Sequence, residues 1–179
     1  MWTGKPASQW LMVVGSFTLF ACVAQTVSTA EQSKPNVAWW YDIEFQPTAN
    51  VVHGLNVRTI DEHWQRAYAL DVIDLQGRIP QDEIKRFNAS PLKFAVTSDL
   101  DGDGAPENFF VGVYEGADGR KGRFVAITRN GRPLQRFEEE GSIGFSALLK
   151  GEAEVRWYKC MECGEFESIK WTGQAFVLE

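Results

Sequence analysis

The sequence predicts an α+β fold in which two short helices precede an antiparallel β-meander of about six strands. Three observations support this prediction. Apolar residues recur at intervals of three and four before residue 90, short apolar runs alternate with turn residues from Leu92 onward, and no internal repeat is present. The missing repeat excludes solenoids and propellers.

The N-terminal thirty residues are typical of a secretory signal peptide. Lys5 precedes the uncharged run LMVVGSFTLFACVA, and the small residues after this run end at Ala30. We expect cleavage after Ala30. The alternatives are a lipoprotein-like site at LFAC, which would leave a lipid anchor on Cys22, and an uncleaved anchor. Cleavage after Ala30 predicts a periplasmic or secreted protein with no membrane span. Cleavage at LFAC predicts a protein that is lipid-anchored to the cell envelope through Cys22.

Residues 31–36 are expected to be a flexible lead-in, and residues 37–179 a single globular domain. Val37–Phe45 is rich in aromatic residues and predicts a strand. Thr59–Leu70 predicts a helix, because Ile60, Trp64 and Ala67 recur at helical spacing. Ile79–Phe87 predicts a second helix, with Pro80 in its first turn.

The predicted strands follow the second helix. NFFVGVY and RFVAIT carry apolar residues on both faces, which is typical of strands covered on both sides. Asn130-Gly131 and Asp118-Gly119 predict tight hairpins. The runs LKFAVTS, GFSALL, AEVRWYK, FESIKW and QAFVLE complete the predicted meander.

Composition excludes one class of partner. The formal net charge of the chain is -6, and Lys and Arg form no run. Nucleic-acid binding needs a concentrated basic face, so we expect no nucleic-acid partner. An unidentified protein or glycan remains the expected kind of partner, with Trp39, Trp40, Trp64, Trp157 and Trp171 as either core residues or a stacking surface.

The segment DLDGDGAPE places carboxylates at alternate positions. Asp99, Asp101 and Asp103 stand at positions 1, 3 and 5 of a nine-residue loop, Gly104 follows, and Glu107 is at position 9. Calcium takes six to eight oxygen ligands, and alternate carboxylates converge on one ion only where glycine allows a tight turn. The loop therefore predicts a Ca²⁺ site. The alternative is an ion-free acidic turn in which the aspartates bond their own backbone.

The loop is not an EF-hand, because that motif needs an acidic residue at position 12, where this chain has Phe110. It resembles the D-x-D-G-D-G-x-x-[DE] calcium loops of FG-GAP and VCBS repeats, which join two strands. The resemblance covers residues 99–107 only, and this chain has one copy. It implies metal ligation by the following groups: the side chains of Asp99, Asp101, Asp103 and Glu107 and the carbonyl of Ala105.

Cys160 and Cys163 form a C-x-x-C motif followed by Gly164. In an oxidising compartment we expect a structural disulfide. A redox-active pair and a zinc site are the alternatives, although a reactive pair normally opens a helix. The sequence thus predicts a non-catalytic binding or accessory domain, with a thiol-disulfide oxidoreductase and an envelope hydrolase as alternatives.

Overall fold

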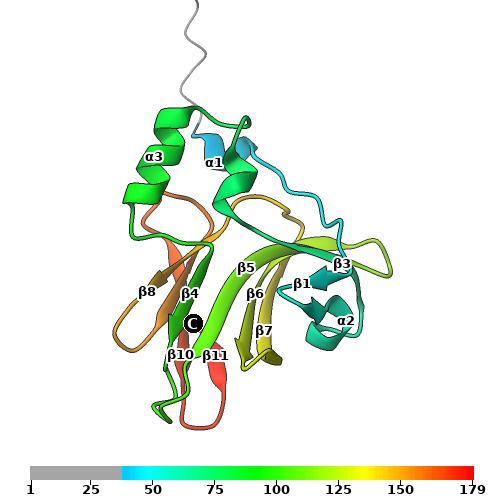
Figure 1. The fold of residues 1–179 in the computed structure, drawn as a ribbon, viewed down its shortest axis with the longest axis vertical. Coiled ribbons are helices and arrows are strands. Elements are labelled where there is room, and N and C mark those ends of the chain that lie inside the picture. Colours follow the sequence, from blue (N-terminus) through cyan, green and yellow to red (C-terminus); the bar gives the residue numbers. More distant parts are fainter. Residues whose placement is uncertain (1–37) are drawn as a thin grey trace, which may run out of the picture. The chain divides into compact units, whose positions relative to one another are not determined.

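The computed structural model describes residues 38–179, which form two antiparallel sheets and one small hairpin. The predicted signal peptide, Cys22 and the predicted lead-in lie outside the described residues. Figure 1 shows the two sheets, with α1 and α3 at one end. The five-stranded sheet has the order β3-β5-β6-β7, with β4 also paired to β5: β3 (Trp64–Ala69), β4 (Ala95–Ser98), β5 (Glu107–Gly116), β6 (Lys121–Arg129) and β7 (Arg132–Glu140). The four-stranded sheet has the order β11-β10-β9-β8: β8 (Ala147–Lys150), β9 (Val155–Tyr158), β10 (Phe166–Trp171) and β11 (Phe176–Leu178).

The predicted α+β class is confirmed, and the helices precede most of the strands. The remaining elements are the hairpin β1 (Val51–Val52) and β2 (Leu55–Asn56), and the helices α1 (Trp39–Asp42), α2 (Val57–Ile60), η1 (Val72–Leu75) and α3 (Gln81–Ala89). In place of the single meander that we expected, the structure has two, β4-β5-β6-β7 and β8-β9-β10-β11. Backbone hydrogen bonds between Lys93 and Leu148 join the two sheets at their adjoining edges.

Helix α3 agrees with the predicted second helix. Ile84 and Phe87 are buried on its inner face, while Asp82 and Glu83 lie in the first turn, where negative charge is favourable. The Ser90 N–H caps the helix by donating to the carbonyl oxygens of its last turn, and Pro91 follows. The short segment specifies this helix because Pro80 at its start, the acidic first turn and the apolar periodicity all favour the same boundaries.

The helix predicted over residues 59–70 is wrong. Helix α2 ends at Ile60, and Trp64–Ala69 form strand β3. A bulge between Trp64 and Arg66 inserts one extra residue, so Trp64 and Ala67 both face the same buried cluster. The bulged strand thereby reproduces the spacing of three residues that we interpreted as helical.

The strand predicted at the start of the domain is also wrong. Trp39–Asp42 form the single-turn helix α1, and the following backbone makes only an isolated bridge between Glu44 and Gly144. The aromatic side chains explain the turn. Trp39 packs edge-on against Phe145 at a centroid distance of 5.1 Å, and Trp40 is buried beside it.

The five-stranded sheet is covered on both faces, as the apolar composition of its central strands predicts. Phe109, Val111 and Val113 of β5 belong to the large core between the sheets and α3. Phe110 and Tyr114 belong to a second cluster on the opposite face, beneath the β1-β2 hairpin and α2. The strand therefore carries apolar side chains at consecutive positions.

The predicted Asn130-Gly131 turn is present, with positive φ angles of 51° and 70°. It leads into β7, a strand that sequence reasoning missed. Most β7 residues are exposed or half-buried, so the strand lacks the apolar alternation on which strand prediction depends.

Tyr68 provides a pH prediction for this fold. Its hydroxyl donates to Asp74 Oδ1 at 2.6 Å, and this bond, with burial, raises the pKa of Tyr68 to about 12. Because the folded-state pKa lies above the unfolded value, the stabilisation is present below about pH 10 and is lost as pH rises towards 12. We expect the urea midpoint of the wild type to fall more steeply between pH 10 and 12 than that of Tyr68→Phe. Equal slopes would contradict the assignment.

Candidate functional site

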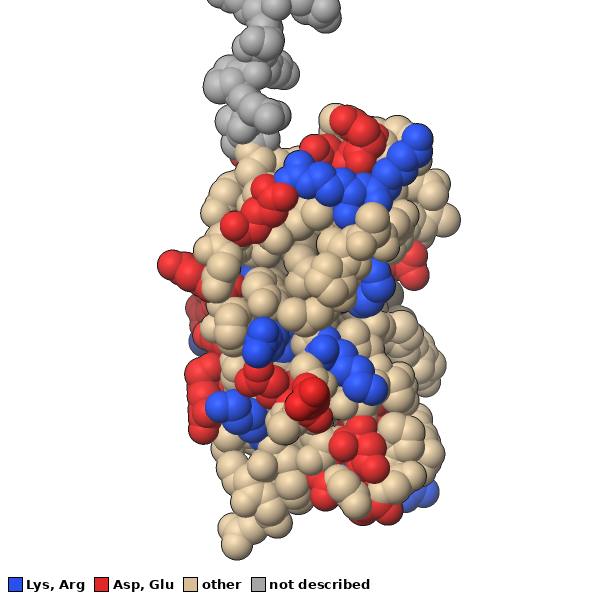
Figure 2. Space-filling model, turned by 90° about the vertical axis from the view of Figure 1, so that its left-hand side faces the viewer, with Lys and Arg blue, Asp and Glu red and all other residues tan. Residues whose placement is uncertain are grey.

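Charges on the described surface are mixed in sign. Figure 2 shows Lys and Arg interspersed with Asp and Glu on the face in view. No helix within residues 38–179 has the length and apolarity needed to span a membrane.

The acidic loop connects β4 to β5. The two strands pair in antiparallel register, with Ser98 opposite Glu107, so residues 99–106 close the turn between them. Gly102 and Gly104 have φ angles of 72° and 85°, a region that residues with a Cβ rarely adopt. The strand flanks and the glycines therefore give the loop the strand-to-strand setting expected from its sequence.

Carboxylates bond the backbone throughout the loop. Asp99 accepts hydrogen bonds from the Gly102 and Gly104 N–H groups, both at 3.0 Å. Asp103 Oδ1 accepts from the Ala105 N–H at 2.8 Å. The ion-free turn and the metal loop both predict such bonds, because a carboxylate oxygen has lone pairs for a backbone donor and a metal together.

Three carboxylates converge at the loop. Ligand oxygens of Asp99, Asp101 and Glu107 all lie within 4.8 Å of one another. Two oxygens on opposite sides of one Ca²⁺ are about 4.6 to 5.2 Å apart, so a single ion can contact all three. Glu107 is fully buried, and its Oε2 accepts the Leu100 N–H at 3.0 Å. Asp103 is outside this group of three.

Arg129 at the end of β6 is the residue of this candidate site that sequence reasoning missed. Its guanidinium pairs with Asp101 and Glu107, and its Nη1 lies 2.6 Å from Asp103 Oδ2. Asn108 pairs with Thr128 in the β5-β6 ladder, so continuing the register places Arg129 opposite Glu107. The predicted Asp118-Gly119 hairpin contained this signal, because it fixes which β6 residue faces each β5 residue.

Arg129 only partly neutralises the loop. Its hydrogen bond holds the pKa of the Asp101 carboxyl below the usual range. Asp99, Asp101, Asp103 and Glu107 carry four formal negative charges against one positive charge on Arg129, which leaves three negative charges. A divalent cation would reduce this to one. The loop therefore has both the oxygen ligands and the remaining negative charge that favour binding of a cation.

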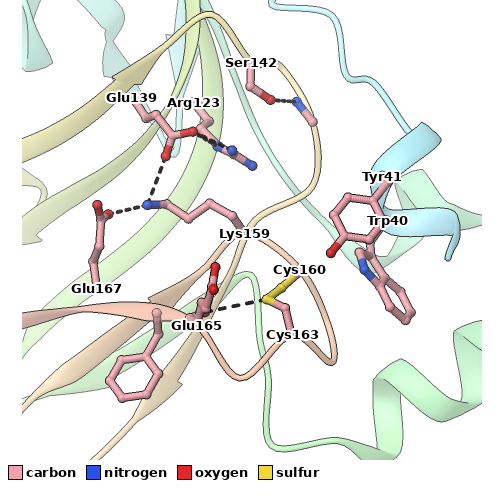
Figure 3. A pocket seen from close by; sticks show the side chains of 12 residues that line it. Trp40, Tyr41, Arg123, Glu139, Ser142, Lys159, Cys160, Cys163, Glu165 and Glu167 are labelled. Atoms are coloured by element: carbon pink, nitrogen blue, oxygen red, sulfur yellow. Dashed lines mark hydrogen bonds and ion pairs between the residues drawn. A yellow bond between two sulfur atoms is a disulfide. The ribbon is translucent and has the colours of Figure 1, made fainter.

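A cavity of about 430 Å³ lies on another part of the domain, and Figure 3 shows its lining. Trp40 and Tyr41 come from α1, and a network of ion pairs faces them across the cavity. Arg123 Nε donates to Glu139 Oε1 at 3.2 Å, and Lys159 Nζ lies 3.0 Å from Glu139 Oε2. Lys159 also pairs with Glu167.

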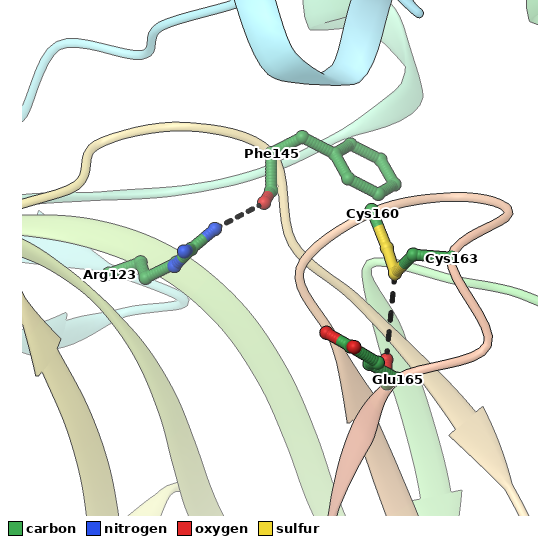
Figure 4. Close-up of a disulfide and its surroundings, with 5 residues drawn as sticks. All are labelled: Arg123, Phe145, Cys160, Cys163 and Glu165. Carbon is green, nitrogen blue, oxygen red and sulfur yellow. Dashed lines mark hydrogen bonds between the residues drawn. A yellow bond between two sulfur atoms is a disulfide. The ribbon is translucent and has the colours of Figure 1, made fainter.

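The predicted disulfide between Cys160 and Cys163 is present and borders this cavity. Figure 4 shows it in the turn between β9 and β10, with Phe145 nearby. Cys163 Sγ lies 3.7 Å from the Glu165 carbonyl oxygen. Cys160 is buried, whereas Cys163 is exposed. No helix begins at the pair, so the helix-end stabilisation that favours a reactive thiolate is missing here.

Removing the disulfide should have a modest effect. The bond spans a sequence separation of only three residues. A loop this short restricts the unfolded chain little, so the disulfide contributes about 2 kcal/mol to the free energy of unfolding. We expect Cys160→Ser/Cys163→Ser to lower the free energy of unfolding by about this amount in urea denaturation. A loss above about 5 kcal/mol would show that the bond does more than close a turn.

Comparison of the chain with protein-family models, curated proteins and solved structures finds no match. Among residues 38–179, the acidic loop is the one cluster of three or more Asp, Glu, His or Cys side chains with metal-binding spacing.

Proposed function

We propose that this protein is a non-catalytic binding domain of the periplasm or extracellular space, stabilised by one Ca²⁺ in the Asp99–Glu107 loop. The observation that carries the proposal is the convergence of Asp99, Asp101 and Glu107 within 4.8 Å. The signal-like N-terminus and the disulfide support the compartment, because such bonds persist outside the cytoplasm.

The proposed ligands are side-chain oxygens of Asp99, Asp101, Asp103 and Glu107 and the carbonyl oxygen of Ala105. This set follows the resemblance to FG-GAP and VCBS calcium loops. The turn between two paired strands and the positive φ angles of Gly102 and Gly104 support it. Bound calcium would neutralise charge and hold β4 against β5.

Calcium affinity should suit an extracytoplasmic site. Extracellular modules bind Ca²⁺ with Kd values of about 0.1 to 1 mM. In that range the ion stabilises the fold outside the cell and does not act as a cytosolic sensor. Arg129 should weaken binding further, because its guanidinium contacts Asp101 and Glu107.

Thermal unfolding tests the calcium role. With a Kd of 0.1 to 1 mM, 10 mM Ca²⁺ should stabilise the fold by about 1.4 to 2.7 kcal/mol relative to EGTA and raise Tm by about 3 to 10 °C. Asp101→Asn should abolish most of this rise. Asp118→Asn is the matched control, since Asp118 is also paired with an arginine, Arg120, but lies in a different turn.

The same Tm in Ca²⁺ and EGTA for the wild type would refute the calcium role. An equal loss of the calcium response in both variants would also count against the loop, because Asp101 belongs to the converging group of carboxylates and Asp118 does not.

The thiol-disulfide oxidoreductase remains a separate proposal with its own test. The pair joins two strands instead of opening a helix, which favours a structural bond. A reduction potential below about -300 mV would indicate an inert bond, whereas a higher potential would favour redox exchange.

A further inference from the structure

Exposed aromatic side chains gather at one site in the described part of the chain. Tyr41 is 67% exposed and Phe166 is 41% exposed, and no other aromatic side chain within residues 38–179 is among its exposed large hydrophobic residues. Both line the cavity of about 430 Å³ beside the disulfide. Exposed aromatic surface is costly in water, and its concentration around one cavity points to a ligand that stacks there.

The cavity lining is close to charge balance. Arg123 and Lys159 supply two positive charges, and Glu139, Glu165 and Glu167 supply three negative ones, a net charge of -1. The cations are committed to partners: Arg123 binds Glu139 and the Phe145 carbonyl, and Lys159 binds Glu139 and Glu167. An anionic ligand would therefore meet no free positive charge.

The accessible polar groups are mainly acceptors. The side chains of Glu139 and Glu167 are 37% and 42% exposed, compared with 12% for Arg123 and 21% for Lys159. A carboxylate only accepts hydrogen bonds, so the ligand must bring many donors. Each sugar hydroxyl can donate and accept, whereas a peptide backbone brings one N–H per residue.

Trp40 differs from the glutamates because it donates a hydrogen bond and does not accept one. Its indole is buried, lines the cavity, and its Nε1–H has no hydrogen-bond partner among the described residues. Figure 3 shows the indole nitrogen on the ring edge towards the rest of the lining. An indole N–H only donates, so an acceptor oxygen of a bound ligand would supply the partner that no described residue provides. A hydroxyl satisfies both Trp40 and the glutamates.

We propose that this cavity binds a neutral oligosaccharide, with Tyr41 stacking on a sugar ring, Phe166 adding apolar contact, and Glu139, Glu167 and Trp40 bonding hydroxyls. The ring of Phe166 already packs against Arg156 and Tyr158, so Tyr41 is the main stacking residue. The volume lies within the range of about 300 to 1,000 Å³ of small-molecule sites. The inference gives a ligand class to the proposed binding role and does not depend on calcium.

The geometry favours binding over cleavage. Glycoside hydrolysis needs one carboxylic acid that remains protonated near neutral pH. Although burial opposes the shift, bonds from Arg123 and Lys159 hold the pKa of Glu139 below its usual range. Glu167 pairs with the same lysine. Glu139 therefore serves as an ionised acceptor for a bound sugar and is not suited to be the protonated general acid.

Nuclear magnetic resonance titration of the ¹⁵N-labelled domain tests the proposal. The probes are chitotetraose, cellotetraose and maltotetraose, each added to 10 mM. We expect at least one to shift the indole N–H signal of Trp40 and to bind with a Kd below about 1 mM, the range of single weak sites. Tyr41→Ala should raise that Kd about five- to tenfold, as expected for one lost aromatic contact. Ile73→Ala is the matched control, because Ile73 is 63% exposed and does not line the cavity.

Two further sets of titrations distinguish a sugar from other classes of ligand and separate sugar binding from calcium binding. Spermidine and an unstructured Gly/Ser peptide replace the sugars, and the sugar titration is repeated at 50 and 500 mM NaCl and in EGTA. A neutral ligand should keep its Kd within about twofold across salt, and sugar binding should persist in EGTA. Failure of all three sugars, tighter binding of spermidine or the peptide, or no effect of Tyr41→Ala would overturn the proposal. Binding in EGTA together with no calcium response would reject the calcium loop alone.

Discussion

Glu107→Ala is expected to lower the free energy of unfolding by about 3 to 5 kcal/mol. Glu107 is fully buried, accepts the Leu100 N–H at 3.0 Å and pairs with Arg129. Alanine would leave the partly buried Leu100 N–H without its partner and remove one of the charges that neutralise Arg129. It would also remove one of the three converging oxygens, so the calcium response of Tm should disappear.

Urea denaturation measures this loss, and Glu115→Ala is its control. Glu115 lies on the same strand, but its carboxylate is partly exposed and 3.5 Å from Lys121. An exposed pair of this kind contributes about 0 to 1 kcal/mol. Similar losses in the two variants would mean that the buried position of Glu107 has no special role.

Arg129→Met should lower Tm in the absence of calcium and should increase the response of Tm to calcium. In EGTA, the variant leaves the loop carboxylates without their cation, so like charges repel and Tm should fall by about 5 to 10 °C. In 10 mM Ca²⁺, the ion should replace the missing charge and gain access to Asp101 and Glu107. The rise in Tm on adding Ca²⁺ should therefore be larger in Arg129→Met than in the wild type.

Differential scanning calorimetry of both proteins in each buffer provides the comparison. Arg120→Met is the control, because Arg120 pairs with Asp118 and Glu140 away from the loop. A smaller calcium response in Arg129→Met than in the wild type would mean that Arg129 supports the metal site and does not compete with it.

Local patterns predicted the elements whose signals agree with one another. Helix α3 has apolar periodicity, Pro80 at its start and acidic residues in its first turn, and Asn130-Gly131 predicted the turn after β6, although strand β7 itself was not predicted. Strand β3 was misread because its bulge gives Trp64 and Ala67 a helical spacing. The aromatic residues of helix α1 are typical of a strand, so its sequence predicts the wrong element. In the structure these residues form one helical turn, and Trp39 packs against Phe145, which is far away in the sequence.

The acidic loop could be found from sequence because its carboxylates lie within nine residues. Its counter-charge could not be found from spacing alone, since Arg129 reaches Glu107 only through the β5-β6 register. The cavity could not be predicted from the sequence for the same reason. Arg123 and Glu139 meet as cross-strand partners, and they face α1 and the 159–167 segment, which are distant in sequence.

Equilibrium dialysis against ⁴⁵Ca²⁺ tests the central claim most directly, because it counts bound ions without depending on stability. We expect one Ca²⁺ per chain with a Kd of about 0.1 to 1 mM, and a loss of that binding in Asp101→Asn but not in Asp118→Asn. Absence of saturable binding by the wild type up to 10 mM, or equal binding by wild type and Asp101→Asn, would contradict the account.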